Sequence, residues 1–172
     1  REGSAARNLE VLVRGITKAN LRRILFCTDD RHPEDILNDG HIDNNIRLAI
    51  KNGIDPISAI KVASLNAAEC YRLYDRGAVA PGYVADLIVM DDIKEFKIEK
   101  VFKSGKLVAN NGKSLFKVKS KKDSKIMNTV NLKQVDKDML KIKLSSDVVN
   151  VMRLLPHSLV TQKVVRKVDT ED

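Results

Sequence analysis

The chain has 172 residues, of which 43% are hydrophobic and 4% aromatic, and its formal net charge is +8. This hydrophobic content is sufficient for a folded core and excludes global disorder. No apolar run approaches the roughly 18–20 residues of a membrane span, and no signal-peptide pattern is present. The two cysteines, Cys27 and Cys70, lie far apart without a metal-ligand spacing. We therefore expect a cytoplasmic protein with no membrane partner.

The excess positive charge is confined to residues 94–143, which hold 15 lysines, no arginine and five acidic residues. Nucleic-acid-binding surfaces usually combine arginine with stacking aromatic side chains. We therefore interpret this stretch as a lysine-rich solvated surface and linker, and expect no nucleic-acid partner. A basic module that binds nucleic acid or acidic partners is the alternative.

Helical periodicity dominates the first part of the chain. Helices are predicted at 4–20, 41–53 and 55–73. Ser4 and Asp55 are the expected N-caps of the first and third of these helices. Between the first two helices, residues 23–28 (RILFCT) have apolar side chains on both faces, which is typical of a strand in a parallel sheet. Cys27 lies within this strand and is expected to be a buried thiol rather than a nucleophile.

After residue 74 the pattern changes from helical to extended. Short apolar segments separated by Gly and Asn predict a meander or sandwich. The predicted strand regions are 83–91, 98–105, 106–113, 128–133, 139–144, 148–155 and 161–168. The fold class is therefore α/β followed by β.

Two adjacent carboxylates, Asp29 and Asp30, follow the predicted strand at 23–28. In barrels and doubly wound sheets, ligands bind beyond the carboxyl ends of the strands. A carboxylate at this position can ligate a divalent metal or exchange a proton with a metal-bound water. Alternatively, one aspartate caps the next turn and the other is solvated. The spacing alone leaves both possibilities open.

The sequence resembles the adenine deaminases, a family within the amidohydrolase superfamily. The stretches that carry this resemblance are REGSAARN (1–8), FCTDDRHPEDILNDGHID (26–43), GIDPISAIKVASLNAAECYRLYDRGAVAPGYVADLIVMDD (53–92) and RLLPHSLVTQKVV (153–165). The first two are specific to that family, whereas the third is similar to many amidohydrolases. The fourth is more loosely similar to the family's extra C-terminal domain.

The resemblance implies a (β/α)8 TIM-type barrel hydrolase that converts adenine to hypoxanthine and ammonia in purine salvage. It also implies a divalent metal, Mn²⁺ or alternatively Fe²⁺, that activates hydroxide, and a homo-oligomer for the full-length enzyme. Asp29 matches the aspartate that follows the eighth strand in the superfamily, which makes it the expected metal ligand and catalytic base. Another amidohydrolase that acts on a cyclic amide or amidine is the competing interpretation.

Other residues of these motifs have two possible roles each. Asp30 is expected either to contact the substrate or the metal-bound water, or to be a structural acid bonded to Arg31 or to loop amides. Arg1, Glu2 and Ser4 either bind the substrate or hold the loop, and the alternative is an ordinary capped junction. His32 and His41 are predicted to anchor loops rather than to bind the metal; they are not assigned as ligands.

The chain starts at Arg1 and contains no His-x-His pair, which the superfamily uses for metal binding. We therefore expect a fragment that alone neither deaminates adenine nor binds metal tightly. The expected division is the last part of the barrel at 1–74, a small β-sandwich segment at 75–116, a lysine-rich linker at 117–125 and the start of a C-terminal β-rich domain at 126–172.

Overall fold

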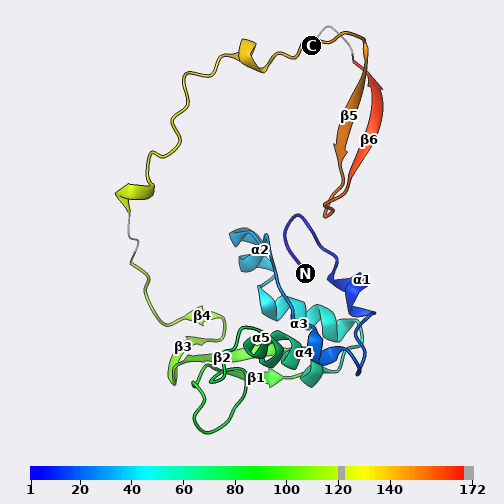
Figure 1. Ribbon diagram of the computed structural model, residues 1–172. Coiled ribbons are helices and arrows are strands. Elements are labelled where there is room, and N and C mark those ends of the chain that lie inside the picture. Colours follow the sequence, from blue (N-terminus) through cyan, green and yellow to red (C-terminus); the bar gives the residue numbers. More distant parts are fainter. Residues whose placement is uncertain (120–122, 169–172) are drawn as a thin grey trace. The chain divides into compact units, whose positions relative to one another are not determined.

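The computed structural model describes residues 1–119 and 123–168 (Figure 1). The chain divides into two compact units. The first unit comprises Arg1–Lys117 with Pro156–Leu159, and the second comprises Val118–Leu155 with Val160–Asp172. The predicted lysine-rich linker falls partly on residues 120–122, which lie outside the described residues. Within the described part of the chain, no helix has both the length and the apolar character needed to cross a membrane.

The structure contains short helices and two antiparallel sheets. The helices are α1 (Leu9–Val13), α2 (Pro33–Asn38), α3 (Ile42–Lys51), α4 (Pro56–Ala63) and α5 (Leu65–Cys70), with 3-10 helices η1 (Leu21–Arg23), η2 (Ser124–Ile126) and η3 (Lys137–Leu140). The strands are β1 (Leu87–Asp92), β2 (Lys97–Lys103), β3 (Lys106–Asn110), β4 (Lys113–Ser114), β5 (Val148–Leu154) and β6 (Thr161–Lys167). The first four strands form one sheet in the order β1-β2-β3-β4, and β5 pairs with β6.

The two predicted helices that follow residue 40 are present, and the second is interrupted. Asp55 caps α4, because its carboxylate accepts the Ser58 N–H at 2.9 Å. The predicted helix 55–73 breaks at Ser64, where φ and ψ are −122° and −74°. The Ser64 hydroxyl donates to the Ile60 carbonyl at 2.6 Å, a contact that competes with the backbone hydrogen bonds of a helix. Two helices, α4 and α5, therefore replace one.

The first predicted helix is much shorter than expected from 4–20, because α1 covers only five residues. Ser4 is not its N-cap. Instead, the Glu2 carboxylate accepts the Leu9 N–H at 3.1 Å at the start of α1. The helix ends just before Gly15, a residue with low helix propensity, and turns of three-residue spacing follow.

The predicted strand at 23–28 is wrong for this chain. Ile24 has extended dihedral angles, φ −111° and ψ 140°, but the described residues supply no neighbouring strand for a ladder. Buried asparagine side chains hold the carbonyls of the segment instead. The Nδ2 atom of Asn66 donates to the Ile24 carbonyl at 2.6 Å, and that of Asn45 donates to the Cys27 carbonyl at 3.1 Å.

The predicted meander is confirmed by the sheet β1–β4, in which consecutive strands pair antiparallel. The hairpin of β5 and β6 confirms two further strands, in a register that runs from Val148 opposite Lys167 to Leu154 opposite Thr161. The strands predicted at 128–133 and 139–144 are not formed, and η3 covers part of the second. Residues 128–144 are all exposed, so no apolar face is buried that would fix a strand there.

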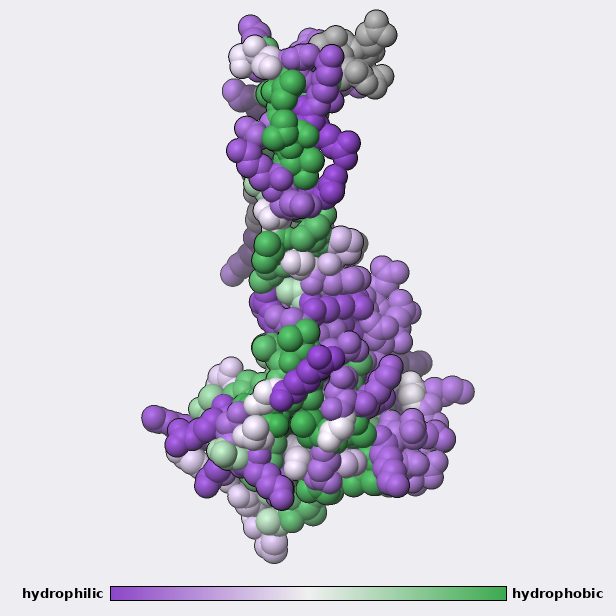
Figure 2. Space-filling view, turned by 90° about the vertical axis from the view of Figure 1, so that its right-hand side faces the viewer, coloured by the Kyte–Doolittle hydropathy of each residue, from purple (hydrophilic) through white to green (hydrophobic). Residues whose placement is uncertain are grey.

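Among the described residues, the hydrophobic core lies in the first unit, where α3 packs against α4 and α1 (Figure 1). Its buried residues are Leu9, Val13, Phe26, Ile46, Ala49, Ala59, Val62 and Phe96. Met90 and Ile98 of the sheet pack against this cluster. Many large hydrophobic side chains remain exposed in both units (Figure 2). Cys27 is among the exposed residues, contrary to the expectation of a buried thiol, because no neighbouring strand covers its face of the segment.

Candidate functional site

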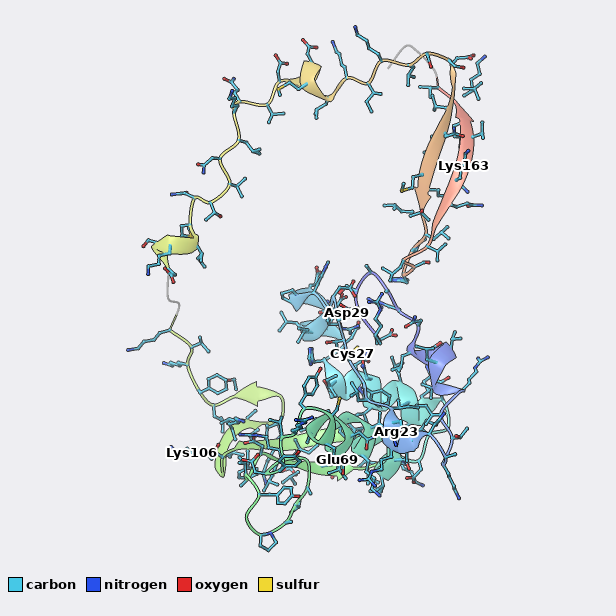
Figure 3. All side chains as sticks on the ribbon, in the orientation of Figure 1. Arg23, Cys27, Asp29, Glu69, Lys106 and Lys163 are labelled. Carbon is cyan, nitrogen blue, oxygen red and sulfur yellow. The ribbon has the colours of Figure 1, made fainter. Side chains whose placement is uncertain are left out.

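Asp29 stands on the stretch of chain that leads from Cys27 to α2 (Figure 3). Its backbone is left-handed, with φ 55°, a conformation that aspartate tolerates better than most residues. The side chain is 46% exposed, and its carboxylate is paired with the guanidinium of Arg1. The structure therefore brings together two residues of the predicted site, and it leaves the carboxylate accessible from outside the core.

Asp29 belongs to a loop that a second loop touches repeatedly. We call residues Arg1–Asn8 the arginine loop and residues Asp29–Gly40 the aspartate loop. The hydroxyl of Ser4 donates to the carboxylate of Asp35 and accepts the His32 N–H at 2.8 Å. The guanidinium of Arg7 also donates to Asp35, at 3.3 Å. The hydrogen bond from Ser4, followed by the charges of nearby arginines, holds the pKa of Asp35 below its ordinary value.

Asp30 makes a third contact between the two loops. Its Oδ2 atom accepts the N–H of Ala5 at 2.7 Å, and this bond is the main reason that the pKa of Asp30 lies below its ordinary value. Gly3 packs against the same side chain, and a Cβ atom there would overlap Asp30 Oδ1. These contacts favour the loop-amide alternative for Asp30. Its Oδ1 atom is buried and has no partner among the described residues, so a substrate contact stays a prediction.

Glu2 and His41 take structural positions. Glu2 is 7% exposed, and its carboxylate is bonded at the start of α1. The ring of His41 lies at the N-terminus of α3, and its Nε2 atom is 3.0 Å from the Oγ1 atom of Thr28. His41 therefore has the predicted structural role, but it holds Thr28 in the extended segment just before the aspartate loop.

Arg31 has a role that the sequence reasoning missed. Its side chain is only 2% exposed, and its Nη2 atom donates to the Asp39 carboxylate at 2.9 Å. The same guanidinium donates to the carbonyls of Asp35 and Gly40, at 3.4 Å and 3.3 Å. It therefore closes the aspartate loop from inside. Acidic residues four and eight positions after the arginine were the available signal, but adjacency had suggested Asp30 as the partner.

The described residues do not form a complete metal site. In residues 1–119 and 123–168, no three His, Cys, Asp or Glu side chains lie close enough together to hold a metal ion. Asp29 offers one carboxylate, which is paired with Arg1, and a catalytic metal commonly takes three protein ligands. A metal at Asp29 would need further ligands from outside the described residues.

A family model described as "Amidohydrolase family" matches residues 2–108, which is more than half of the chain. The chain therefore belongs to the amidohydrolase family, whose members are TIM-barrel proteins. The match includes the aspartate loop, the arginine loop except Arg1, helices α1 to α5 and the strands β1 and β2.

Similar proteins extend the match over almost the whole chain. The adenine deaminase of Clostridium acetobutylicum is 50% identical over 170 residues, which cover 98% of this chain and 30% of that protein. The adenine deaminase of Nitratidesulfovibrio vulgaris (strain DP4) is 48% identical over 98% of this chain and 29% of its own length. The adenine deaminase of Halalkalibacterium halodurans is 41% identical over 100% of this chain and 30% of its own length. The predicted resemblance to adenine deaminases is confirmed, and the chain spans about 30% of the length of these relatives.

Proposed function

We propose that this chain is the part of a metal-dependent adenine deaminase that contributes Asp29 to the active site. The observation that carries the proposal is the 50% identity to a protein named adenine deaminase over 98% of the chain. The position of Asp29 supports it, because its exposed carboxylate directly follows an extended segment. The reaction is hydrolytic: water adds to C6 of adenine, the C6–N bond breaks, and hypoxanthine and ammonia leave.

Asp29 has two tasks in this proposal. Its carboxylate would be one ligand of the divalent metal, which would supply hydroxide near neutral pH. The same carboxylate accepts the proton of the attacking water and passes a proton to the departing amine, because an amide ion is a very poor leaving group. The paired Arg1 holds the carboxylate in place before the metal binds.

The remaining candidates divide between substrate contact and loop support. Arg1 and Asp30 are proposed to contact the purine, Arg1 from beside Asp29 and Asp30 through its unpartnered Oδ1 atom. Ser4 and Glu2 are proposed to act through the arginine loop, since Ser4 binds the aspartate loop and Glu2 binds the start of α1. Ser4 and Glu2 would then affect substrate binding indirectly, by keeping the arginine loop in its conformation.

The proposed architecture follows the relatives' greater length. Residues 1–74 would supply the last strand and helices of a (β/α)8 barrel, 75–116 part of a β-sandwich, and 126–172 the start of a C-terminal β-rich domain. The remaining metal ligands would come from the rest of the enzyme. We further propose Mn²⁺, or alternatively Fe²⁺, as the metal, a homo-oligomeric cytoplasmic enzyme, and adenine as its small-molecule substrate.

The test compares the intact enzyme that contains this segment with the 172-residue chain alone. Both are supplied with Mn²⁺ and assayed for hypoxanthine formed from adenine, and for hydrolysis of cyclic amides. We expect adenine turnover by the intact enzyme and none by the chain alone. Hydrolysis of a cyclic amide without turnover of adenine would refute the substrate. Turnover by the chain alone would refute the need for outside ligands.

A further inference from the structure

We propose that the start of α3, with its N-cap residue His41 and its residue Asn45, is a positioning element that fixes the two residues before Asp29 and so aims its carboxylate. The inference rests on the proposed function, because it gives these residues a role in the reaction assigned to Asp29. Neither residue is expected to touch the substrate.

The first observation is the pair of contacts that α3 makes with the extended segment. His41 is the N-cap of α3 and Asn45 lies in its first turns, and both side chains reach the extended segment. The Nε2 atom of His41 is 3.0 Å from Thr28 Oγ1, and Asn45 Nδ2 donates to the Cys27 carbonyl at 3.1 Å. One contact holds a side chain and the other holds the backbone.

The second observation is the burial of the groups involved. Asn45 is 0% exposed and Thr28 is 7% exposed, although the surrounding core is apolar. A buried amide or hydroxyl is unfavourable unless it is hydrogen-bonded, so the Nδ2 atom of Asn45 and the hydroxyl of Thr28 are held to their partners, whereas the Oδ1 atom of Asn45 is buried with no partner among the described residues. Burial also keeps water from replacing the contacts. The hydrogen bonds therefore restrict the segment more than surface contacts would.

The third observation is that the Cys27 carbonyl accepts a second hydrogen bond. The N–H of Glu2 donates to it at 3.1 Å, from the arginine loop that also contains Arg1. The segment is thus fixed from α3 on one side and from the arginine loop on the other. The hydrogen bond from Glu2 to the Cys27 carbonyl therefore links the arginine loop, which carries Arg1, to the segment that precedes Asp29.

The consequence concerns the direction of the carboxylate. Asp29 is left-handed, with φ 55°, a sparsely populated conformation that persists where neighbouring residues hold it. Any rotation of the backbone at Thr28 would change the position and direction of the Asp29 carboxylate. Proton transfer requires the acid or base to lie within hydrogen-bond reach of the reacting atom. A segment fixed at both Cys27 and Thr28 would keep the carboxylate in one direction for this transfer.

The test uses the intact enzyme and removes one hydroxyl. Thr28→Val keeps the shape of the side chain but cannot bond His41. We expect kcat for adenine to fall about tenfold or more while KM changes less than about twofold, because a misplaced catalytic group slows chemistry more than binding. Thr28→Ser retains the hydroxyl and should keep kcat within about threefold of the unaltered enzyme.

Two comparisons separate positioning from general stability. Thr161→Val, at an exposed position of β6, should leave kcat unchanged. His41→Gln offers an amide to the Thr28 hydroxyl, whereas His41→Leu does not, so we expect a larger loss of kcat in the second variant. This pair decides the question if Thr28→Val fails to fold.

A readout that does not depend on turnover is amide hydrogen exchange of the peptide that contains Asp29. We expect faster exchange in Thr28→Val and unaltered exchange in Thr28→Ser. Equal kcat in Thr28→Val and the unaltered enzyme, or equal losses in the Val and Ser variants, would overturn the inference. If the unaltered enzyme does not deaminate adenine, the proposed function fails, and the exchange rates still decide whether α3 fixes the segment.

Discussion

The two units of this chain have similar kinds of residues and very different interiors. The first unit buries eight apolar residues in one cluster contributed by α1, α3, α4, the extended segment and the β1–β2 turn. The described residues of the second unit include none that is buried, and its main element is the hairpin of β5 and β6. Apolar residues therefore produce a core only where elements of different kinds can cover one another's faces.

The hairpin of β5 and β6 shows that strand pairing alone buries little apolar surface. The seven aligned residue pairs of β5 and β6 satisfy backbone groups, but the apolar side chains Val148, Val151, Met152 and Leu154 stay exposed. An isolated two-stranded hairpin is marginally stable in water. We therefore expect substitutions in the first unit to change the stability of the chain and matched substitutions in the second unit to leave it almost unaltered.

The largest difference is expected for leucine truncation. Leu9 is 3% exposed in the core, whereas Leu154 is 77% exposed in β5. Leu9→Ala should lower the free energy of unfolding of the 172-residue chain by about 2–5 kcal/mol, since it leaves a cavity. Leu154→Ala should change it by less than about 0.5 kcal/mol. Urea denaturation measures both, and equal effects would show that the two units do not differ as described.

The next difference concerns buried and exposed arginines. Arg31→Met removes hydrogen bonds to one carboxylate and two carbonyls inside the aspartate loop, and should cost about 2–3 kcal/mol of unfolding free energy. Arg153→Met, at an exposed position of β5, should cost less than about 0.5 kcal/mol. Limited proteolysis of the aspartate loop provides a second measurement. A protected loop in Arg31→Met would contradict the proposed closure from inside.

Helix caps provide a smaller contrast. Asp55 caps α4, whose residues Ala59 and Val62 are fully buried, and Asp55→Ala should cost about 1 kcal/mol. Asp136 accepts the Asp138 N–H at the start of η3, which has no buried residue. Asp136→Ala should lower the free energy of unfolding by no more than roughly a few tenths of a kcal/mol, because η3 has no buried residue whose packing its formation would support. Thermal unfolding of both variants checks the difference.

The smallest expected effect is a pH dependence. The hydroxyl of Ser4 is the main cause of the lowered pKa of Asp35, so Ser4→Ala should raise that pKa toward its ordinary value. A lowered pKa means that the hydroxyl stabilises the folded state above about pH 4, and that this advantage disappears as the pH falls through the folded pKa.

A carbon-13 titration of Asp35 by NMR measures this change. Asp92 serves as an internal control, because backbone amides of Glu95 and Lys94 lower its pKa and Ser4 is not among the causes. We expect the difference in stability between Ser4→Ala and the unaltered chain to become smaller as the pH falls below about pH 4 and through the folded pKa of Asp35. An unaltered pKa of Asp35 in the variant would show that the hydroxyl does not bind the carboxylate.

Local signals predicted the parts of the fold that local interactions determine. The helix at 41–53 followed from its apolar spacing, the start of α4 from its cap at Asp55, and the meander from Gly and Asn between short apolar runs. The segment 23–28 could not be predicted in the same way. Its apolar residues specify burial on both faces, but a strand also requires neighbours to which its backbone can bond.

The candidate site was predictable in composition and less so in geometry. The pairing of Arg1 with Asp29 joins two motifs that the sequence had already marked, whereas the link between Thr28 and His41 was expected only in general form. The buried roles of Arg31 and Asn45 were missed. Arg31 depends on partners in the turn between α2 and α3, whereas Asn45 depends on the Cys27 carbonyl of the extended segment, and sequence spacing does not reveal which carbonyl either side chain meets.

The most direct test of the central claim is Asp29→Asn in the intact enzyme, assayed for hypoxanthine formed from adenine. Asparagine has nearly the same shape but cannot accept the proton, so kcat should fall by about a thousandfold. Asp91→Asn is the matched control, because Asp91 is exposed and, among the described residues, is paired only with Lys97 at 3.3 Å. An Asp29→Asn enzyme that is as active as Asp91→Asn would contradict the account.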